Sequence, residues 1–222
     1  TAAPWIDADM AVLQQDFLPA DWLAASSGKV TGVVAVQART SWAENQFLLA
    51  LAQAEPRVKA VVGWFDFEAD VCAQLELAQT TPLLKGFRHL IQDEAQPSVY
   101  LNTHAGLNQA LPRLQAASYV YEVLVHQADL AAAVAFCQRH DGHYLVIDHM
   151  AKPVFGDAAA FAHWQQHMQA LAALPHVVVK VSGLETELGL GGSVQDLREH
   201  VDTVYQLFGA ERLLLGSDWP VS

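Results

Sequence analysis

The sequence predicts an α/β fold of the (β/α)₈ barrel type, and three observations support that prediction. Short β-branched runs recur along the 222 residues, and each is followed by an Ala/Leu/Gln-rich segment with helical spacing. The runs start roughly 25 to 35 residues apart, which is typical of βα units in a parallel sheet. A polar residue ends run after run, and a barrel gathers the carboxyl ends of its strands into one ring where its active sites lie.

Seven of the eight barrel strands are visible in the sequence. We expect them at residues 33–37, 58–67, 83–88, 121–126, 144–149, 177–182 and 213–217. The polar residues at their ends are Gln37, Asp66, Arg88, His126, His149, Ser182 and Asp218. No Gly-x-Gly-x-x-Gly follows any of these strands, which disfavours the alternative of an open dinucleotide-binding sheet. The pattern therefore favours the barrel.

The helices between the strands have recognisable ends. Ser41 and Glu44 form a capping-box pattern ahead of a helix over residues 45–54, which Pro56 ends. Further helices are expected over residues 128–140 and 158–174. No linker or low-complexity segment interrupts the chain, so we predict one domain over residues 1–222.

Composition excludes several classes of partner. The formal net charge is −12 and no basic cluster occurs, which argues against nucleic acid and anionic membranes. No apolar run reaches the roughly 20 residues of a membrane helix. Cys72 and Cys137 do not form a Cys-x-x-Cys motif, and two unpaired thiols fit a reduced, cytoplasmic setting. We therefore expect a cytoplasmic protein that binds a small, neutral molecule.

Asp218 and His149 are the strongest candidates for chemistry. Asp218 follows an apolar strand, where a carboxylate can deprotonate water or bind a metal ion that lowers the pKa of water. A turn aspartate in Ser-Asp-x-Pro explains the same pattern about equally well. His149 also follows an apolar strand, where a histidine can polarise a carbonyl, move a proton or ligate a metal ion. The alternative for His149 is a structural imidazole bonded to a loop carbonyl.

Other polar residues at the strand ends are candidates for substrate binding. Arg88 can hold a carboxylate or ring oxygens in its planar fork, although a solvated loop arginine is the simpler interpretation. Lys180 lies inside a strand, where an unpaired ammonium group is costly. The remaining candidates are Gln37, Trp64 and Trp219 for substrate contact and His126 for metal binding. Glu44 is better explained by the capping box, and Asp148 is interpreted as structural.

Several segments of this sequence resemble segments of a known family and occur in the same order as in that family. They are residues 34–38 with Glu44-Asn45, 61–64, 85–89, 146–153, 179–184 and 212–221, the last containing Gly216-Ser217-Asp218-Trp219-Pro220. Together these segments resemble the amidohydrolase-2 group of the amidohydrolase superfamily, and within it the sugar lactonases of the L-fuconolactonase and L-rhamnonolactonase type. The resemblance covers nearly the whole chain.

The resemblance implies a distorted (β/α)₈ barrel that opens a sugar lactone. Asp218 is then the carboxylate that activates water, and His149 lies beside the substrate carbonyl. The developing charge on the carbonyl oxygen is then stabilised by His149, by Arg88 or by a divalent metal ion, so the hydrolase is either metal-dependent or metal-independent. If a metal ion is used, zinc is the first choice, with Asp218 and His126 as its ligands, and a homodimer is a possible assembly. The family's first-strand His-x-His pair is absent from this sequence. We therefore expect that strand one and the C-terminal helix of the natural protein lie outside these 222 residues.

Two other functions fit the same pattern. A decarboxylase or hydratase of the same superfamily would use the same aspartate and metal ion on an unsaturated acid. A barrel that binds a small molecule without catalysis would explain the missing His-x-His pair. The residues upstream of Thr1 would separate this second alternative from an enzyme.

Overall fold

A computed structural model describes residues 6, 10–26, 29–189 and 194–221. By their internal contacts the described residues form two compact units. The first runs to Arg88 and includes Trp219–Val221, and the second is His89–Asp218. Each unit is described by itself.

Parallel strands alternate with helices in both units, which confirms the predicted α/β class. The strands are β1 (Val33–Val36), β2 (Val58–Gly63), β3 (Leu84–His89), β4 (Val120–Val123), β5 (Leu145–Ile147), β6 (Val177–Val181) and β7 (Leu213–Leu215). In the first unit β2 pairs in parallel with β1 and with β3. In the second unit β4, β5, β6 and β7 pair in parallel in chain order. Consecutive parallel neighbours are the arrangement that a (β/α)₈ barrel requires.

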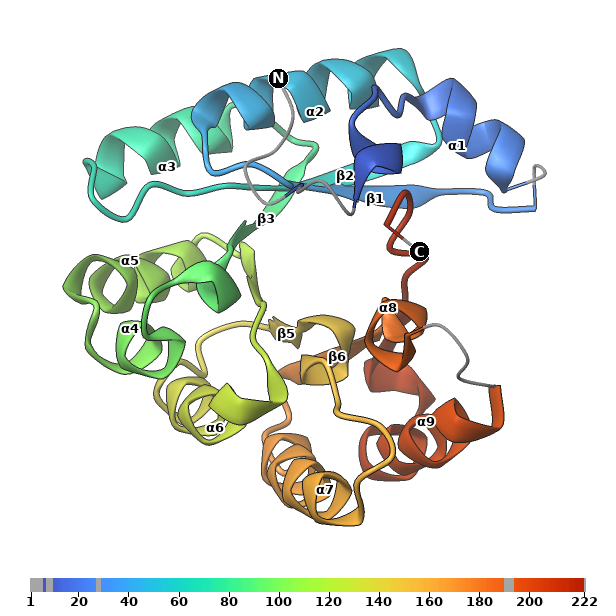
Figure 1. Cartoon of the computed structure of the whole chain (residues 1–222). Coiled ribbons are helices and arrows are strands. Elements are labelled where there is room, and N and C mark those ends of the chain that lie inside the picture. Colours follow the sequence, from blue (N-terminus) through green and yellow to red (C-terminus); the bar gives the residue numbers. More distant parts are fainter. Residues whose placement is uncertain (1–5, 7–9, 27–28, 190–193, 222) are drawn as a thin grey trace. The chain divides into compact units, whose positions relative to one another are not determined.

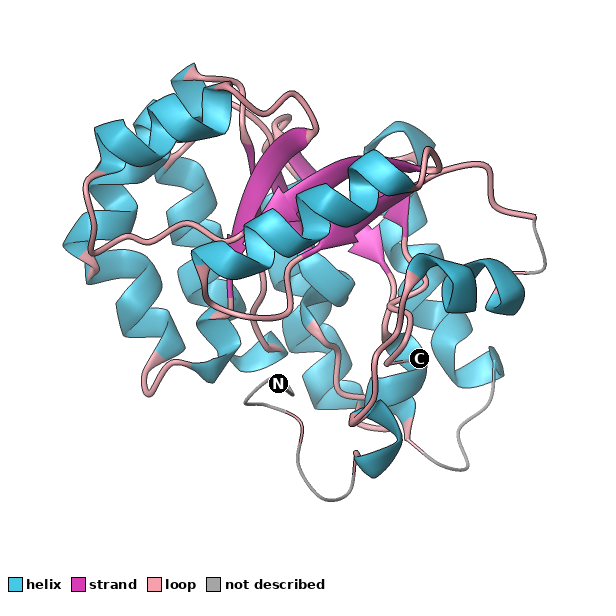
Figure 2. Ribbon diagram, turned by 90° about the horizontal axis from the view of Figure 1, so that it is seen from above, coloured by secondary structure: helices cyan, strands magenta, loops and turns pink. Residues whose placement is uncertain are grey.

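The helices lie beside these strands (Figures 1 and 2). The α-helices are α1 (Pro19–Ala25), α2 (Trp42–Ala54), α3 (Val71–Gln79), α4 (Pro97–Thr103), α5 (Ala105–Ala116), α6 (Leu130–Arg139), α7 (Ala158–Ala172), α8 (Leu184–Leu188) and α9 (Val194–Phe208). Short 3₁₀ turns are η1 (Ala11–Leu13), η2 (Ile91–Asp93), η3 (Gln127–Asp129), η4 (Asp148–Ala151) and η5 (Ala210–Arg212). Helix α2 packs on β1 and β2, whereas α7 and α9 pack on β6. Among the described helices, none has the length and apolarity needed to cross a bilayer.

The three predicted helices are present as α2, α6 and α7, with ends that differ from the predicted ones by up to three residues. Ser41 accepts a hydrogen bond from the Glu44 amide and begins α2. The Glu44 side chain does not complete the capping box. Its carboxylate instead accepts bonds from the amide of Ala38 at 3.2 Å and from Arg39 Nε at 2.6 Å. The prediction for Glu44 was wrong in this respect, because the preceding loop supplies a cationic partner that a local pattern does not show.

Six of the seven predicted strands extend past the observed carboxyl ends, whereas β3 continues one residue beyond its predicted end, to His89. Strand β2 stops at Gly63, although the apolar run continues to Phe67. Beyond Gly63, the Asn45 side chain replaces the ladder by bonding to the amide and the carbonyl of Trp64 at 2.7 and 2.8 Å. A Cβ atom at Gly63 would lie 2.6 Å from Asn45 Oδ1, so glycine is needed there. The conformation of the loop after β2 is thus determined by a side chain of α2.

The second unit has a dense apolar core around its strands. Its fully buried large side chains include Leu107, Leu111, Leu114, Tyr121, Leu130, Phe136, Leu145 and Trp164. Burial of each such side chain stabilises the fold by roughly 1.5–3 kcal/mol before the entropy cost of ordering it. Residues of β4, β5 and β6 belong to this core, whereas Leu214 and Leu215 of β7 are exposed.

Two buried histidines in this core make stability depend on pH. Burial lowers the pKa of His140 to about 4, with a smaller effect from Arg139, and burial also lowers the pKa of His200. Between about pH 6.5 and 4 the His140 side chain is protonated in the unfolded chain but neutral in the fold, and the lowered pKa of His200 acts in the same direction. We therefore expect the free energy of unfolding to fall as pH is lowered through this window, measured by urea unfolding at pH 7, 6 and 5.

Substitution of one histidine tests the origin of this slope. His140→Gln removes the titrating ring and keeps a donor for Asn108 Oδ1, which the ring contacts at 2.9 Å. The variant is expected to lose stability less steeply than the wild type below pH 6.5. His163→Gln, on the exposed surface of α7, controls for the substitution itself. An unchanged slope in His140→Gln would contradict the assignment.

Candidate active site

The register of the second unit brings the ends of β5, β6 and β7 to one level. Ile147 pairs with Val179 across β5 and β6, and Val181 pairs with Leu215 across β6 and β7. The residues that follow these strands therefore meet at one edge of the sheet. His149, Ser182 and Asp218 come from these three loops.

His149 lies in a turn of unusual backbone geometry. His149, Met150, Ala151 and Lys152 are four successive non-glycine residues with φ between 49° and 58°. This left-handed conformation costs roughly 1–2 kcal/mol for each L-residue, so tertiary contacts must stabilise it. The turn is buried, and Trp164 Nε1 donates a 2.8 Å hydrogen bond to the Met150 carbonyl. Such strain is most common at functional sites.

The imidazole of His149 lies between a hydroxyl group and a carboxylate. Its Nδ1 is 2.9 Å from Ser182 Oγ, and its Nε2 is 3.7 Å from Asp218 Oδ1. The second distance is too long for a direct hydrogen bond, so both groups can contact a third atom. His149 and Ser182 are buried, whereas about a quarter of the Asp218 side chain is accessible. Asp218 also has a positive φ, of 54°.

Two glycines allow the loops that carry His149, Ser182 and Asp218 to approach one another closely. A Cβ atom at Gly183 would lie 2.8 Å from His149 Nδ1 and 2.9 Å from Asp218 Oδ2. Gly183 also has a φ of 64°, which disfavours other residues. A Cβ atom at Gly216 would lie 2.9 Å from Ser182 Cβ. The two glycines therefore line the group formed by His149, Ser182 and Asp218, which we call the His–Asp site.

Lys180, near this site, contacts two buried carboxylates. Its Nζ is 2.7 Å from Glu122 Oε2 and 2.6 Å from Asp148 Oδ1. Both carboxylates are buried, and Asp148 is fully inaccessible. The pairing explains how a lysine is tolerated inside a parallel strand, because an unpaired buried charge costs several kcal/mol. Asp148 has the structural role that the sequence indicated.

The first unit contains a separate polar group around Gln37 and Arg88. Gln37 Nε2 donates a 3.0 Å hydrogen bond to the Arg88 carbonyl, and Arg88 Nη2 donates to the Gln37 carbonyl. Gln37 is fully buried, and among the described residues its Oε1 has no hydrogen-bond partner. Trp64 is half-buried, and Trp219 packs edge-on against Phe17 with ring centroids 5.5 Å apart.

Comparison with known proteins identifies the family. The amidohydrolase family profile matches residues 8–222. The chain belongs to the amidohydrolase family. This amidohydrolase is 42% identical over 228 residues to L-fucono-1,5-lactonase of Burkholderia multivorans, covering 98% of this chain and 77% of that protein. It is 35% identical to L-fucono-1,5-lactonase of Burkholderia ambifaria, covering 98% of this chain and 75% of the relative.

Solved structures agree with the family. An amidohydrolase from Burkholderia multivorans with bound zinc superimposes with a TM-score of 0.90 at 43% identity, covering 98% of this amidohydrolase and 79% of that chain. A putative 2-pyrone-4,6-dicarboxylic acid hydrolase from Pseudomonas putida has a TM-score of 0.70 at 24% identity, covering 95% and 77% of the two chains. This second likeness shows the fold alone.

The residues of this amidohydrolase supply only part of a metal site. His149 Nε2 and Asp218 Oδ1 are donors that divalent zinc accepts, and they are close enough to share one ion. Within the described ranges, no three His, Cys, Asp or Glu side chains are grouped closely enough to hold a metal ion. His126, the predicted further ligand, is exposed at the start of η3. Because a zinc site takes at least three protein ligands, the described residues do not fit a complete one.

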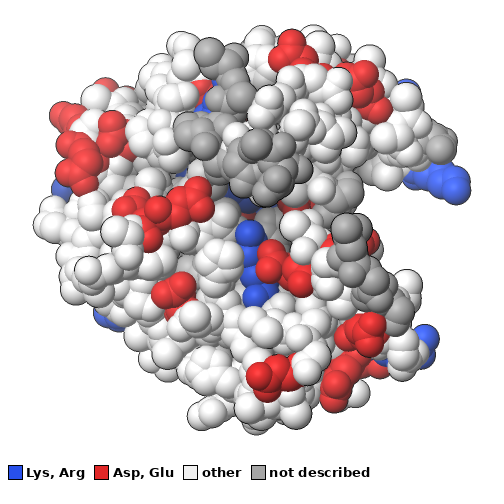
Figure 3. Space-filling view, in the orientation of Figure 1, with Lys and Arg blue, Asp and Glu red and all other residues white. Residues whose placement is uncertain are grey.

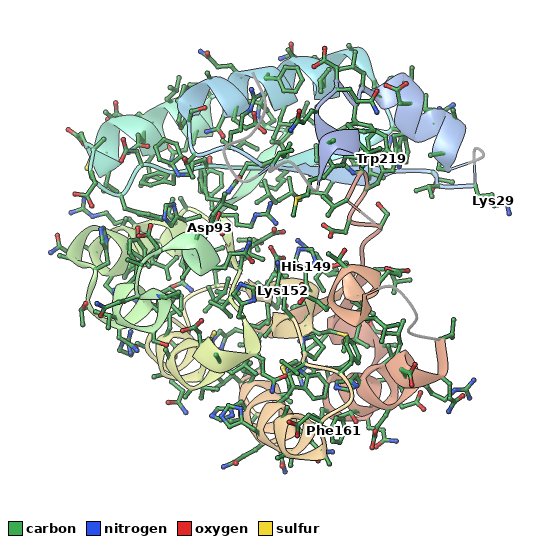
Figure 4. All side chains as sticks on the ribbon, viewed as in Figure 1. Lys29, Asp93, His149, Lys152, Phe161 and Trp219 are labelled. Carbon is green, nitrogen blue, oxygen red and sulfur yellow. The ribbon has the colours of Figure 1, made fainter. Side chains whose placement is uncertain are left out.

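The structure brings some predicted site residues together and adds others. His149 and Asp218 meet as expected, and Lys152 comes from the same turn as His149 (Figure 4). The predicted site did not include Ser182, Gly183 or Glu122. A signal existed for Glu122, a lone acid inside an apolar strand, and for Ser182, which shares a face of β6 with Lys180. The substrate contacts expected of Gln37, Trp64, Arg88, Lys180 and Trp219 stay predictions.

Proposed function

We propose that this protein opens a sugar lactone by hydrolysis at the His–Asp site. The observation that carries the proposal is the pair of His149 Nε2 and Asp218 Oδ1, 3.7 Å apart at the carboxyl ends of the strands. Two relatives that align with 98% of this chain, at 42% and 35% identity, are L-fucono-1,5-lactonases. Their activity supports a sugar lactone as the substrate. This is the hydrolase class that the sequence predicted.

The chemistry needs one proton acceptor and one hydrogen-bond donor. The Asp218 carboxylate accepts a proton from water, and the water oxygen bonds to the lactone carbonyl carbon. The carbonyl π electrons move to the oxygen, which receives a hydrogen bond from His149 Nε2–H. When the carbonyl re-forms, the bond to the ring oxygen breaks and that oxygen takes the proton from Asp218. The product is an open-chain hydroxy acid, which ionises and releases a proton to solvent.

Charge favours a neutral substrate over an acidic one. The chain has a formal net charge of −12, and acidic side chains outnumber basic ones on the face shown in Figure 3. In the turn that carries His149, Lys152 Nζ lies 3.6 Å from Glu187 Oε1, so its charge is offset by a carboxylate. Repulsion by this surface slows the approach of a dianionic acid relative to a neutral sugar lactone. We therefore favour a neutral aldono-lactone over the unsaturated acids of the alternative function.

A panel of substrates separates these functions. The protein is incubated with L-fucono-1,5-lactone, other neutral aldono-lactones and 2-pyrone-4,6-dicarboxylate, and acid release is followed with a pH indicator. Decarboxylation of aromatic acids is followed in parallel by release of carbon dioxide. We expect turnover above the spontaneous rate for neutral aldono-lactones. Folded protein that turns over only the unsaturated acids, or none of the compounds, would contradict the proposal.

A further inference from the structure

The turn that carries His149 is attached to Lys180, in strand β6, and to Ser182, the residue that directly follows this strand. Lys180 is the fourth residue of β6 and Ser182 comes one residue after its end, so the two side chains, two positions apart, project to the same side. Lys180 Nζ contacts Asp148 Oδ1 at 2.6 Å, and Ser182 Oγ contacts His149 Nδ1 at 2.9 Å. The carboxyl end of β6 and the residue after it thus hold both Asp148, which begins the turn, and the ring of His149.

The turn needs such attachments because its backbone is unfavourable. Four successive left-handed residues are not a conformation that this sequence would adopt alone. Inside the turn, the Lys152 amide donates to the His149 carbonyl at 2.8 Å. From outside, α7 contributes the bond of Trp164 to Met150, and β6 and the residue after it contribute Lys180 and Ser182. Among these contacts, the one from Ser182 reaches the imidazole itself.

We infer that Ser182 and Lys180 are positioning residues that set the orientation and the tautomer of His149. The inference rests on the proposed function, in which His149 Nε2–H faces the substrate carbonyl. Lys180 then acts through Asp148 and the turn, because its ammonium group is held by Asp148 and by Glu122.

The geometry determines which tautomer Ser182 favours. The negatively charged carboxylate of Asp218 lies on the Nε2 side of the ring, 3.7 Å from Nε2, so its charge favours a proton on Nε2. Nδ1 is then an acceptor, and the Ser182 hydroxyl donates to it. Without this donor, the free Nδ1 is no longer satisfied and the alternative tautomer becomes accessible. Loss of Ser182 should therefore reduce kcat through His149, although Ser182 does not touch the substrate.

The first test compares variants of Ser182. Ser182→Ala is expected to lower kcat at least 10-fold while KM changes less than 2-fold, because substrate contacts are kept. Ser182→Cys keeps a weaker donor in the same place and should fall between alanine and wild type. Threonine is unsuitable as a rescue because the Gly216 backbone packs closely on Ser182 Cβ. Ser98→Ala, which removes the 2.6 Å bond of Ser98 to Asp129, is the control that should keep kcat.

The second test does not depend on activity. Nitrogen-15 NMR of histidine-labelled protein reports which ring nitrogen carries the proton, and His149→Gln assigns the signals of His149. We expect a single Nε2–H tautomer in wild type and in Ser98→Ala, and a shift toward the Nδ1–H tautomer in Ser182→Ala. Asp148→Asn weakens the contact of residue 148 with Lys180, while Lys180 remains paired with Glu122. This variant should broaden or shift the same signals.

The two tests separate this inference from the proposed function. Unchanged kcat and unchanged His149 signals in Ser182→Ala would overturn the positioning role even if the wild type is an active lactonase. A wild type that opens no lactone would overturn the proposed function, while a tautomer change in Ser182→Ala would still support the positioning role.

Discussion

Replacement of Asp218 by asparagine is expected to lower kcat for lactone opening by about 100-fold or more, the usual effect of losing a general base. The amide cannot accept the proton from water, although its size is nearly the same. About a quarter of the side chain is accessible, so the fold should not depend on its charge. The measurement is steady-state acid release, together with circular dichroism and thermal unfolding of the same sample.

The matched control for this variant is Asp202→Asn, an exposed carboxylate on α9. It carries the same change of charge and should keep the wild-type kcat. Wild-type activity in Asp218→Asn would show that another group activates water. An unfolded Asp218→Asn protein would show that the carboxylate is structural, as in the alternative interpretation of the Ser-Asp-x-Pro turn.

Replacement of Gly183 by alanine is expected to reduce kcat at least 10-fold. The new Cβ atom would lie within 3 Å of both His149 Nδ1 and Asp218 Oδ2, so at least one of these side chains must move. Displacement of a reacting group by a fraction of an ångström is enough for a loss of this size. The positive φ adds a cost of roughly 1 kcal/mol to folding. Activity and urea unfolding are measured on the same preparation.

Gly156→Ala separates the clash from the backbone strain. Gly156 also has a positive φ, of 78°, but an added Cβ atom would meet nothing within 4 Å. This control should lose about the same stability as Gly183→Ala from strain alone and keep its kcat. Equal activities of the two variants would contradict the close packing of the His–Asp site.

Much of the fold could be predicted because it follows from local patterns. The parallel strands appear as β-branched runs, since strands covered on both faces must be apolar throughout. Helix ends at Ser41 and Asp157 follow from side chains that bond to the first amides of a helix. Strand ends were less predictable: β2 stops at Gly63 because Asn45, from a helix, replaces the ladder.

The site could be predicted only in part. His149 and Asp218 were visible because each follows an apolar strand, but the left-handed turn was not. The stretch His149–Lys152 has no glycine, and its backbone is determined by contacts with Trp164, Lys180 and Ser182, which are 12 or more residues away in sequence. The partners of Lys180 were equally hidden, because Glu122 belongs to another strand.

The most direct test of the proposed function is the initial rate of acid release from L-fucono-1,5-lactone by the wild-type protein, compared with the spontaneous rate in the same buffer. We expect a rate proportional to protein concentration and well above the spontaneous one, with open-chain hydroxy acid as the product. A rate equal to the spontaneous one, from protein shown to be folded, would contradict it.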